Sequence, residues 1–230
     1  QYQIKKPTKV SIIIPTKDQF GLLSQCVESL TQKTAYTNYE VIVVDNQTTE
    51  EQALSYLDKI NALENITVLK WDEPFNYSKI NNFAAKQATG EVLVFLNNDT
   101  EIINESWLEE LVSQALRPDV GAVGAKLYFP NGTIQHAGII LDIGPDNWAG
   151  HCFIGFPKDS HGDNGRASLI QNYCAVTAAC MATRRELFLD TGGFDEELKV
   201  ACNDVDYCLK LHMQGYRNLW TPYCELVHHE

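Results

Sequence analysis

The sequence predicts an α/β fold with a doubly wound, mostly parallel sheet, and two observations lead to this expectation. In the first half, short apolar runs alternate with longer segments in which apolar residues recur at helical spacing. Such alternation is typical of strand–helix–strand units, which build a parallel sheet with helices on both faces. In the second half, strand-like segments flank a turn, which indicates a smaller mixed sheet. We expect a single domain over residues 1–230, with two halves at 1–118 and 119–230.

Four apolar runs in the first half are expected to be buried strands. They span residues 10–14, 39–44, 66–71 and 92–96. The runs are apolar at nearly every position rather than at alternate ones, which is typical of strands covered on both faces. Pro15 follows the first run and is expected to end it.

Four further segments of the first half are predicted to be helices. Their apolar residues recur three or four positions apart, so that they share one face of a helix. The four sets are Leu22, Leu23, Cys26, Val27 and Leu30; Ala53, Leu54, Leu57 and Ile60; Ile80, Phe83, Ala84 and Ala88; and Trp107, Leu108, Leu111, Val112 and Leu116. Gly90 and Pro118 stand just beyond the last two sets, where these residue types commonly end helices.

The second half shows weaker periodicity. Residues 120–128 and 134–142 are predicted strands on either side of a turn at 130–132. Residues 144–166 are rich in glycine, aspartate and histidine, and we expect a long polar loop that is functional or mobile. A last helix carries apolar residues on one face and polar residues in its first turn, namely Val205, Cys208, Leu209 and Met213 on the face and Asn203, Asp204 and Asp206 in the turn.

Charge and composition weigh against several classes of protein. The formal net charge is −12 and there is no basic run, which argues against binding nucleic acid through its phosphates. No apolar run approaches the roughly 20 residues that a transmembrane helix needs. The seven cysteines form no CxxC pair, which favours a reducing compartment over a disulfide framework. The chain does not begin with Met, and we expect it to be excised from a longer protein.

Polar clusters follow three of the predicted strands: residues 15–18, Asp45–Asn46 and Asn97–Asn98–Asp99. Parallel sheets place ligands at the carboxyl ends of their strands. A carboxylate there can hold Mg²⁺ or Mn²⁺ together with substrate phosphates, or accept a hydrogen bond from a ribose or a base. The alternative is turn chemistry, in which an Asx side chain caps the next helix. These residues alone leave both interpretations open.

Two residues near the end of the chain could act in catalysis. Asp204 stands at a predicted helix start, where the helix dipole favours an ionised carboxylate that can accept a proton. His228 follows Leu226 and Val227 at a predicted strand end, and a neutral imidazole can bind Mn²⁺. A plain helix-terminal acid and a packed histidine are the alternatives. Asp206 points elsewhere on the helix, and His136, His151 and His161 show no metal-ligand spacing.

The order of these features resembles that of family 2 inverting glycosyltransferases with the GT-A fold, including bacterial rhamnosyltransferase-like enzymes of O-antigen, capsule and other surface polysaccharides. The resemblance covers nearly the whole chain. The matching stretches are 10–16, 40–46, 81–85, 90–100, 192–196, 203–209 and 228–230.

The resemblance implies a role for each candidate residue. Asp99 and His228 would bind Mn²⁺ or Mg²⁺, and Asp204 would be the catalytic base. The nucleotide-sugar donor would be bound by Pro15, Thr16, Asp45, Asn82, Asn97 and Asn98. Residues 1–118 would bind the nucleotide, and 119–230 would bind the acceptor and carry catalysis. Asn97 replaces the first acid of the family's DxD motif, and Asn203 replaces the Glu often found before the base.

The resemblance also implies a reaction and a location. A sugar would move, with inversion, from a UDP- or dTDP-sugar to a hydroxyl of a glycan or lipid-linked glycan acceptor. The expected location is the cytoplasm, with peripheral attachment to the inner face of the membrane as an option. One alternative is a catalytically inactive nucleotide- or glycan-binding module, which the amide residues Asn97 and Asn203 keep open. A sugar nucleotidyltransferase is the other, although its glycine-rich, basic phosphate loop is missing near the first strand.

Overall fold

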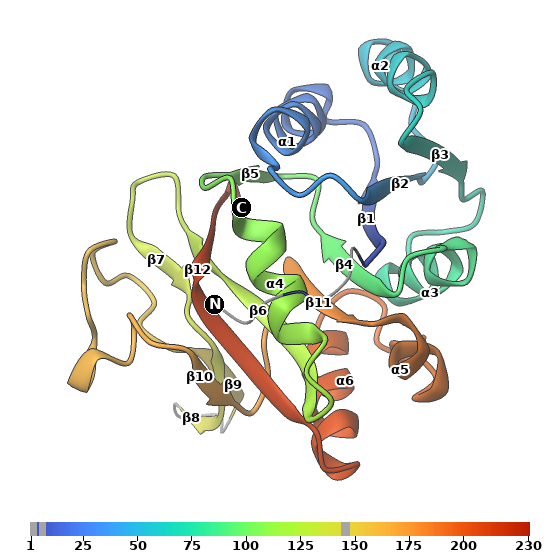
Figure 1. The fold of residues 1–230 in the computed structure, drawn as a ribbon. Helices are drawn as coiled ribbons and strands as arrows, with labels where there is room; N and C mark the ends of the chain where they lie inside the picture. Colours follow the sequence, from blue (N-terminus) through green and yellow to red (C-terminus); the bar gives the residue numbers. More distant parts are fainter. Residues whose placement is uncertain (1–3, 5–7, 144–147) are drawn as a thin grey trace.

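The structure is a computed structural model that describes residues 4, 8–143 and 148–230 (Figure 1). Its centre is a sheet of ten strands among the described residues, in the order β10-β12-β6-β11-β4-β1-β2-β3, with β5 on β12 and β7 on β6. The strands of the first half are β1 (Val10–Thr16), β2 (Tyr39–Asp45), β3 (Ile66–Lys70), β4 (Val92–Leu96) and β5 (Thr100–Ile102). Those of the second half are β6 (Val120–Tyr128), β7 (Ile134–His136), β10 (Gln171–Tyr173), β11 (Cys180–Arg184) and β12 (Arg217–His228).

The helices cover both faces of this sheet (Figure 1). On one face lie α1 (Phe20–Lys33), α2 (Glu51–Asn61) and α4 (Trp107–Ala115), whose buried residues form one core cluster with alternate residues of the strands. On the other face lie α3 (Tyr77–Gln87), α5 (Arg185–Asp190) and α6 (Asn203–Met213), which share a second cluster. In β1, Ile12 and Ile14 belong to the first cluster and Ile13 to the second. Burial on both faces explains why the strand reads as a continuous apolar run.

The predicted α/β fold is confirmed. The apolar runs form β1 to β4, and β1 pairs in parallel with both β2 and β4. The second half, however, largely extends the same sheet: β11 lies between β4 and β6 and pairs antiparallel with each of them. A separate small sheet consists of the antiparallel pair β8 (Ile139–Ile143) and β9 (Trp148–His151).

The prediction of one strand over 134–142 was wrong, because the chain breaks between β7 and β8. Gly138 has φ +99°, and a Cβ there would lie 2.1 Å from the ring of Tyr173. Only glycine fits such a position. Within the predicted polar loop, residues 144–147 lie outside the described part, while β9 and the short 3₁₀ helix at Asp163–Gly165 give the rest some regular structure.

The sheet topology brings the segment after β4 next to the C-terminal end of β12. Residues 97–99 leave the carboxyl end of β4 and enter β5, and β5 pairs antiparallel with the end of β12. In that register Thr100 lies opposite His228, and the N–H of His229 donates to the carbonyl of Asp99 at 2.9 Å. No helix in the described ranges is long and apolar enough to cross a membrane.

Candidate active site

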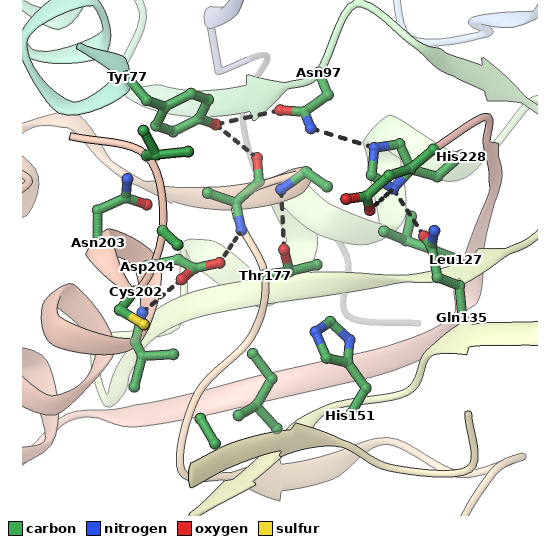
Figure 2. Close-up of a pocket in the computed structure, with 18 of the residues that line it drawn as sticks. Tyr77, Asn97, Leu127, Gln135, His151, Thr177, Cys202, Asn203, Asp204 and His228 are labelled. Carbon is green, nitrogen blue, oxygen red and sulfur yellow. Dashed lines mark hydrogen bonds and ion pairs between the residues drawn. The ribbon is translucent and has the colours of Figure 1, made fainter. Parts of the chain in front are cut away.

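A cavity of about 480 Å³ opens at the carboxyl ends of the central strands. We call it the central cavity (Figure 2). It is walled by the loop after β4, by β7 and β9, by the segment before β11, by the start of α6 and by the end of β12. The polar side chains that line it include Tyr77, Asn97, Asp99, Gln135, His151, Thr177, Asn203, Asp204, His228 and Glu230. The topology thus gathers three predicted site residues, Asp99, Asp204 and His228, around one space.

A second cavity, of about 410 Å³, adjoins the first. We call it the β1 cavity, because residues at and after the end of β1 line it. Tyr77, Asn97 and Asp99 line both cavities, so these side chains stand between the two. The predicted nucleotide-binding residues Pro15, Thr16 and Asn98 lie in the β1 cavity. The amide of Asn98 donates to the hydroxyl of Thr16 at 2.9 Å, which ties the ends of the neighbouring strands β1 and β4 together.

Asp45 ends β2 but lines neither cavity. It is 6% exposed, and its carboxylate accepts a local hydrogen bond, at 3.0 Å, from the N–H of Thr48 three residues further on. The next residue, Asn46, lines the β1 cavity instead. Its amide nitrogen donates to the carbonyls of Trp71 and Glu73, which follow β3. Its buried oxygen Oδ1 has no partner within the described structure. Asn46 is therefore a better-placed contact for a ligand than Asp45.

Asn82 serves the scaffold in this structure. Its side-chain oxygen accepts from the N–H of Phe194 at 3.0 Å, and its nitrogen donates to the carbonyl of the same residue at 2.9 Å. Gly193 passes so close that a Cβ would lie 2.5 Å from Asn82 Oδ1. Asn82 lines neither cavity. It fixes the Gly192–Glu196 loop to α3, and its predicted contact with a donor stays a prediction.

Asp99 and His228 lie in contact with each other on the wall of the central cavity. Nε2 of His228 lies 3.0 Å from Oδ1 of Asp99, and the Asn97 amide nitrogen lies 3.3 Å from the same ring nitrogen. Burial raises the pKa of Asp99, but the hydrogen bond and the charge that the His228 ring supplies when Nε2 is also protonated outweigh burial and hold this pKa below its ordinary value.

Gln135, which no sequence pattern singled out, fixes the orientation of the His228 ring. Its oxygen Oε1 lies 2.8 Å from Nδ1 of His228, within the buried interior. An amide oxygen only accepts, so Nδ1 carries the proton and neutral His228 presents a lone pair at Nε2. That lone pair faces the carboxylate of Asp99.

The pair Asp99 and His228 fits a divalent cation. Oδ1 of Asp99 is buried and has no hydrogen bond of acceptable geometry in the described structure. With neutral His228, two electron-pair donors lie 3.0 Å apart without a hydrogen between them. A cation would relieve this arrangement, and one carboxylate with one imidazole leaves room for substrate phosphates. Glu230 lies farther away, with Oε2 3.8 Å from Nδ1 of His228.

Asp204 stands in the first turn of α6, where the chain enters the helix through Cys202 in a left-handed conformation, φ +64°. Its two oxygens accept from the backbone N–H groups of Ala178, at 3.0 Å, and Val205, at 2.8 Å. The side chain is half-buried and lines the central cavity. Asp206, by contrast, pairs with Lys210 at 2.7 Å and lines neither cavity.

Comparisons with known proteins identify the family of the chain. Residues 11–190 match the sequence profile of the family described as glycosyl transferase family 2. The chain belongs to this family. The resemblance noted in the sequence is thereby confirmed.

Two curated relatives match almost the whole chain. It is 48% identical over 223 residues to the uncharacterized protein y4gI of Sinorhizobium fredii, covering 96% of this chain and 24% of the relative. It is 46% identical over 235 residues to the O-antigen biosynthesis protein RfbC of Myxococcus xanthus, covering 100% of this chain and 18% of the relative. The chain thus spans a quarter or less of the length of these relatives.

Among solved structures, the chain resembles GalNAc-T7 with UDP, GalNAc and Mn²⁺. The TM-score is 0.80 at 16% identity, and the match covers 99% of this chain and 45% of the other. At this identity the likeness concerns the fold. It confirms the expected GT-A architecture.

Proposed function

We propose that this chain is the catalytic domain of an inverting glycosyltransferase that uses a nucleotide-diphosphate sugar, a UDP- or dTDP-sugar, and acts in surface polysaccharide synthesis. Its acceptor is a hydroxyl of a glycan or lipid-linked glycan. One observation carries the proposal: the carboxylate of Asp204 lines the same cavity as the pair Asp99 and His228. The O-antigen biosynthesis protein among the relatives supports the polysaccharide context.

The two cavities suit the two parts of such a donor. The β1 cavity, lined by Thr16, Asn46 and Asn98, offers amides and a hydroxyl to a base and ribose. The central cavity begins at Asp99, where a diphosphate would lie, and continues toward Asp204. Residues 1–118 thereby supply the nucleotide contacts, and residues 119–230 supply the base and most of the sugar-facing wall.

Asp204 is the proposed general base. The N–H groups of Ala178 and Val205 hold its carboxylate in place. Asp204 accepts the proton of the acceptor hydroxyl while that oxygen forms a bond to the anomeric carbon. The bond from the anomeric carbon to the diphosphate oxygen breaks with its electron pair on that oxygen. Attack from the face opposite the leaving group inverts the anomeric centre.

Asp99 and His228 would hold Mn²⁺ or Mg²⁺. Such a cation, when bound, neutralises charge on the leaving diphosphate. Gln135 supports this because it accepts from Nδ1 of His228, so that in the neutral ring the lone pair is on Nε2, which faces Asp99. The Mn²⁺ in the structure of the fold relative GalNAc-T7 supports the same choice of ion.

The first experiment is a ligand panel. Thermal unfolding is followed with UDP, dTDP, GDP and CMP, each with and without Mn²⁺. We expect stabilisation by one diphosphate that depends on the metal, because a ligand stabilises the folded state by RT ln(1 + [L]/Kd). Release of free nucleotide from the matching nucleotide sugar then tests turnover. Binding without any release would favour an inactive binding module, and stabilisation by none of the ligands would contradict the proposal.

A further inference from the structure

Two histidines form a contact that the proposed mechanism does not use. His136 lies in β7 and is fully buried, whereas His151 ends β9 and lines the central cavity. Their Nδ1 atoms are 2.9 Å apart, and the rings meet edge-on, with centroids 4.8 Å apart at an interplanar angle of 78°. At this distance one hydrogen must lie between the two nitrogens.

A contact between His136 and the backbone indicates which ring supplies that hydrogen. The N–H of Thr177 donates to Nε2 of His136 in a long hydrogen bond of 3.5 Å. Nε2 of His136 is therefore the unprotonated nitrogen, and its Nδ1 carries the proton. The proton points at Nδ1 of His151, which must accept it. Neutral His151 consequently carries its own proton on Nε2, the nitrogen that is free of this pair.

Both rings stay neutral in this environment. Burial lowers the pKa of His136, and the neighbouring His151 and His228 lower it further. Burial also lowers the pKa of His151, although Asp204 and Glu230 oppose the shift. A second proton on His151 would place an N–H against that of His136 at 2.9 Å, and a second proton on His136 would face the N–H of Thr177, so the geometry itself disfavours charging either ring.

The surroundings of His151 suit a sugar. The same part of the cavity is lined by Ile139, Ala149 and Ile154, which can pack against the C–H face of a pyranose ring. Figure 2 shows His151 on the β9 side of the cavity, whereas Asp204 comes from α6. A neutral N–H complements a hydroxyl or ring oxygen, and the carboxylate of Asp204 complements a hydroxyl proton.

We propose that His151 binds a sugar of the substrate by donating its Nε2–H to a sugar oxygen, and that His136 is a positioning residue that sets the tautomer of His151. This rests on the proposed function for the identity of the ligand. The tautomers themselves follow from the contacts in the protein alone. They can therefore be measured without donor, acceptor or turnover.

The first test is imidazole ¹⁵N NMR of the ¹⁵N-labelled 230-residue chain at neutral pH. The expected result is a proton on Nδ1 of His136 and on Nε2 of His151, with both rings neutral. His136→Asn keeps a donor near the position of Nδ1 and should preserve the His151 tautomer, whereas His136→Leu should release it. An imidazolium at either residue, or a proton on Nε2 of His136, would overturn the positioning role whatever the chain catalyses.

The second test compares His151→Leu with His151→Gln, whose amide can still donate. UDP, UDP-N-acetylglucosamine, dTDP and dTDP-rhamnose are titrated with Mn²⁺, and free N-acetylglucosamine and rhamnose are titrated by NMR. Loss of one hydrogen bond should weaken sugar binding about three- to tenfold in His151→Leu, with partial recovery in His151→Gln. A loss confined to the nucleotide sugars identifies the donor sugar. A loss seen only with the free sugars or in the acceptor KM identifies the acceptor. Equal binding by both variants and the wild type overturns the sugar contact, even where the diphosphates still bind.

Discussion

Nδ1 of His228 donates to Oε1 of Gln135 at 2.8 Å, across 93 residues of sequence. A hydrogen bond from one ring nitrogen fixes the tautomer and the orientation of a histidine that binds a metal through its other nitrogen. Here the other nitrogen lies 3.0 Å from the carboxylate of Asp99. The buried amide of Gln135 is thus part of the proposed cation site although it does not face the cation.

Gln135→Leu should lower the affinity for Mn²⁺ by about 10- to 100-fold, because the His228 ring would lose its acceptor at Nδ1. The affinity is measured by titrating Mn²⁺ in the presence of the nucleoside diphosphate that stabilises the wild type. Gln214→Leu, at an exposed position after α6, is the matched control and should leave the affinity unchanged. A Gln135→Leu protein that folds and binds Mn²⁺ within twofold of the wild type would remove Gln135 from this role.

Asp204→Asn should lose about 10²- to 10⁴-fold in sugar transfer, because the amide cannot accept the proton of the hydroxyl. The nucleoside diphosphate should still raise the Tm of this variant, since Asp204 does not line the β1 cavity. Asp206→Asn is the control on the same helix, and its ion pair with Lys210 lies outside both cavities. Nucleotide release from the nucleotide sugar, measured for the wild type, Asp204→Asn and Asp206→Asn, tests whether Asp204 is the base. Similar rates in Asp204→Asn and Asp206→Asn would show that Asp204 is not the base.

The sequence predicted those parts of the fold whose burial leaves a local pattern. The run Val92–Leu96 is apolar at every position because helices cover both faces of the sheet. The short strands β5 and β10 have three residues each, too few to show a period, and only their partners make them strands. The break at Gly138 depends on the ring of Tyr173, 35 residues away in the sequence, which no local signal reveals.

The candidate site likewise contains residues that local sequence indicates and residues that only long-range contacts reveal. Asp99, Asp204 and His228 could be named because their residue types at strand and helix ends are chemically informative. Gln135 and His151 could not, because their importance depends on contacts with residues 93 and 15 positions away. One signal was available: Gln135 and His136 are polar residues inside a segment predicted to be a strand, and both are buried. Buried polar side chains need partners, so such a pair indicates a network.

Asn82→Ala should cost about 1–3 kcal/mol of the free energy of unfolding, because it removes the buried hydrogen bonds to Phe194. A domain of this size loses about 2–4 °C in Tm for each kcal/mol. Asn131→Ala, in an exposed turn, is the control and should shift the Tm much less. The variant also tests the family-based expectation for Asn82. A fall in nucleotide affinity larger than the lost stability explains would indicate a contact with the donor, and an unchanged Tm would contradict the scaffold role.

Glu40 should make the folded state sensitive to acid. Burial raises its pKa, but hydrogen bonds from Lys9, Ser11 and Thr89 outweigh burial and lower the pKa from 4.5 to about 2. Because the folded-state pKa is the lower one, these contacts stabilise the protein fully above about pH 4.5, and the stabilisation is lost as the pH falls toward 2. The difference in free energy of unfolding between wild type and Glu40→Gln, from urea denaturation, should therefore shrink as the pH is lowered through this range. Glu64→Gln, at an exposed glutamate, is the control for the substitution itself in the same comparison. A difference for Glu40→Gln that stays constant with pH would mean that the carboxylate gains nothing from these three partners.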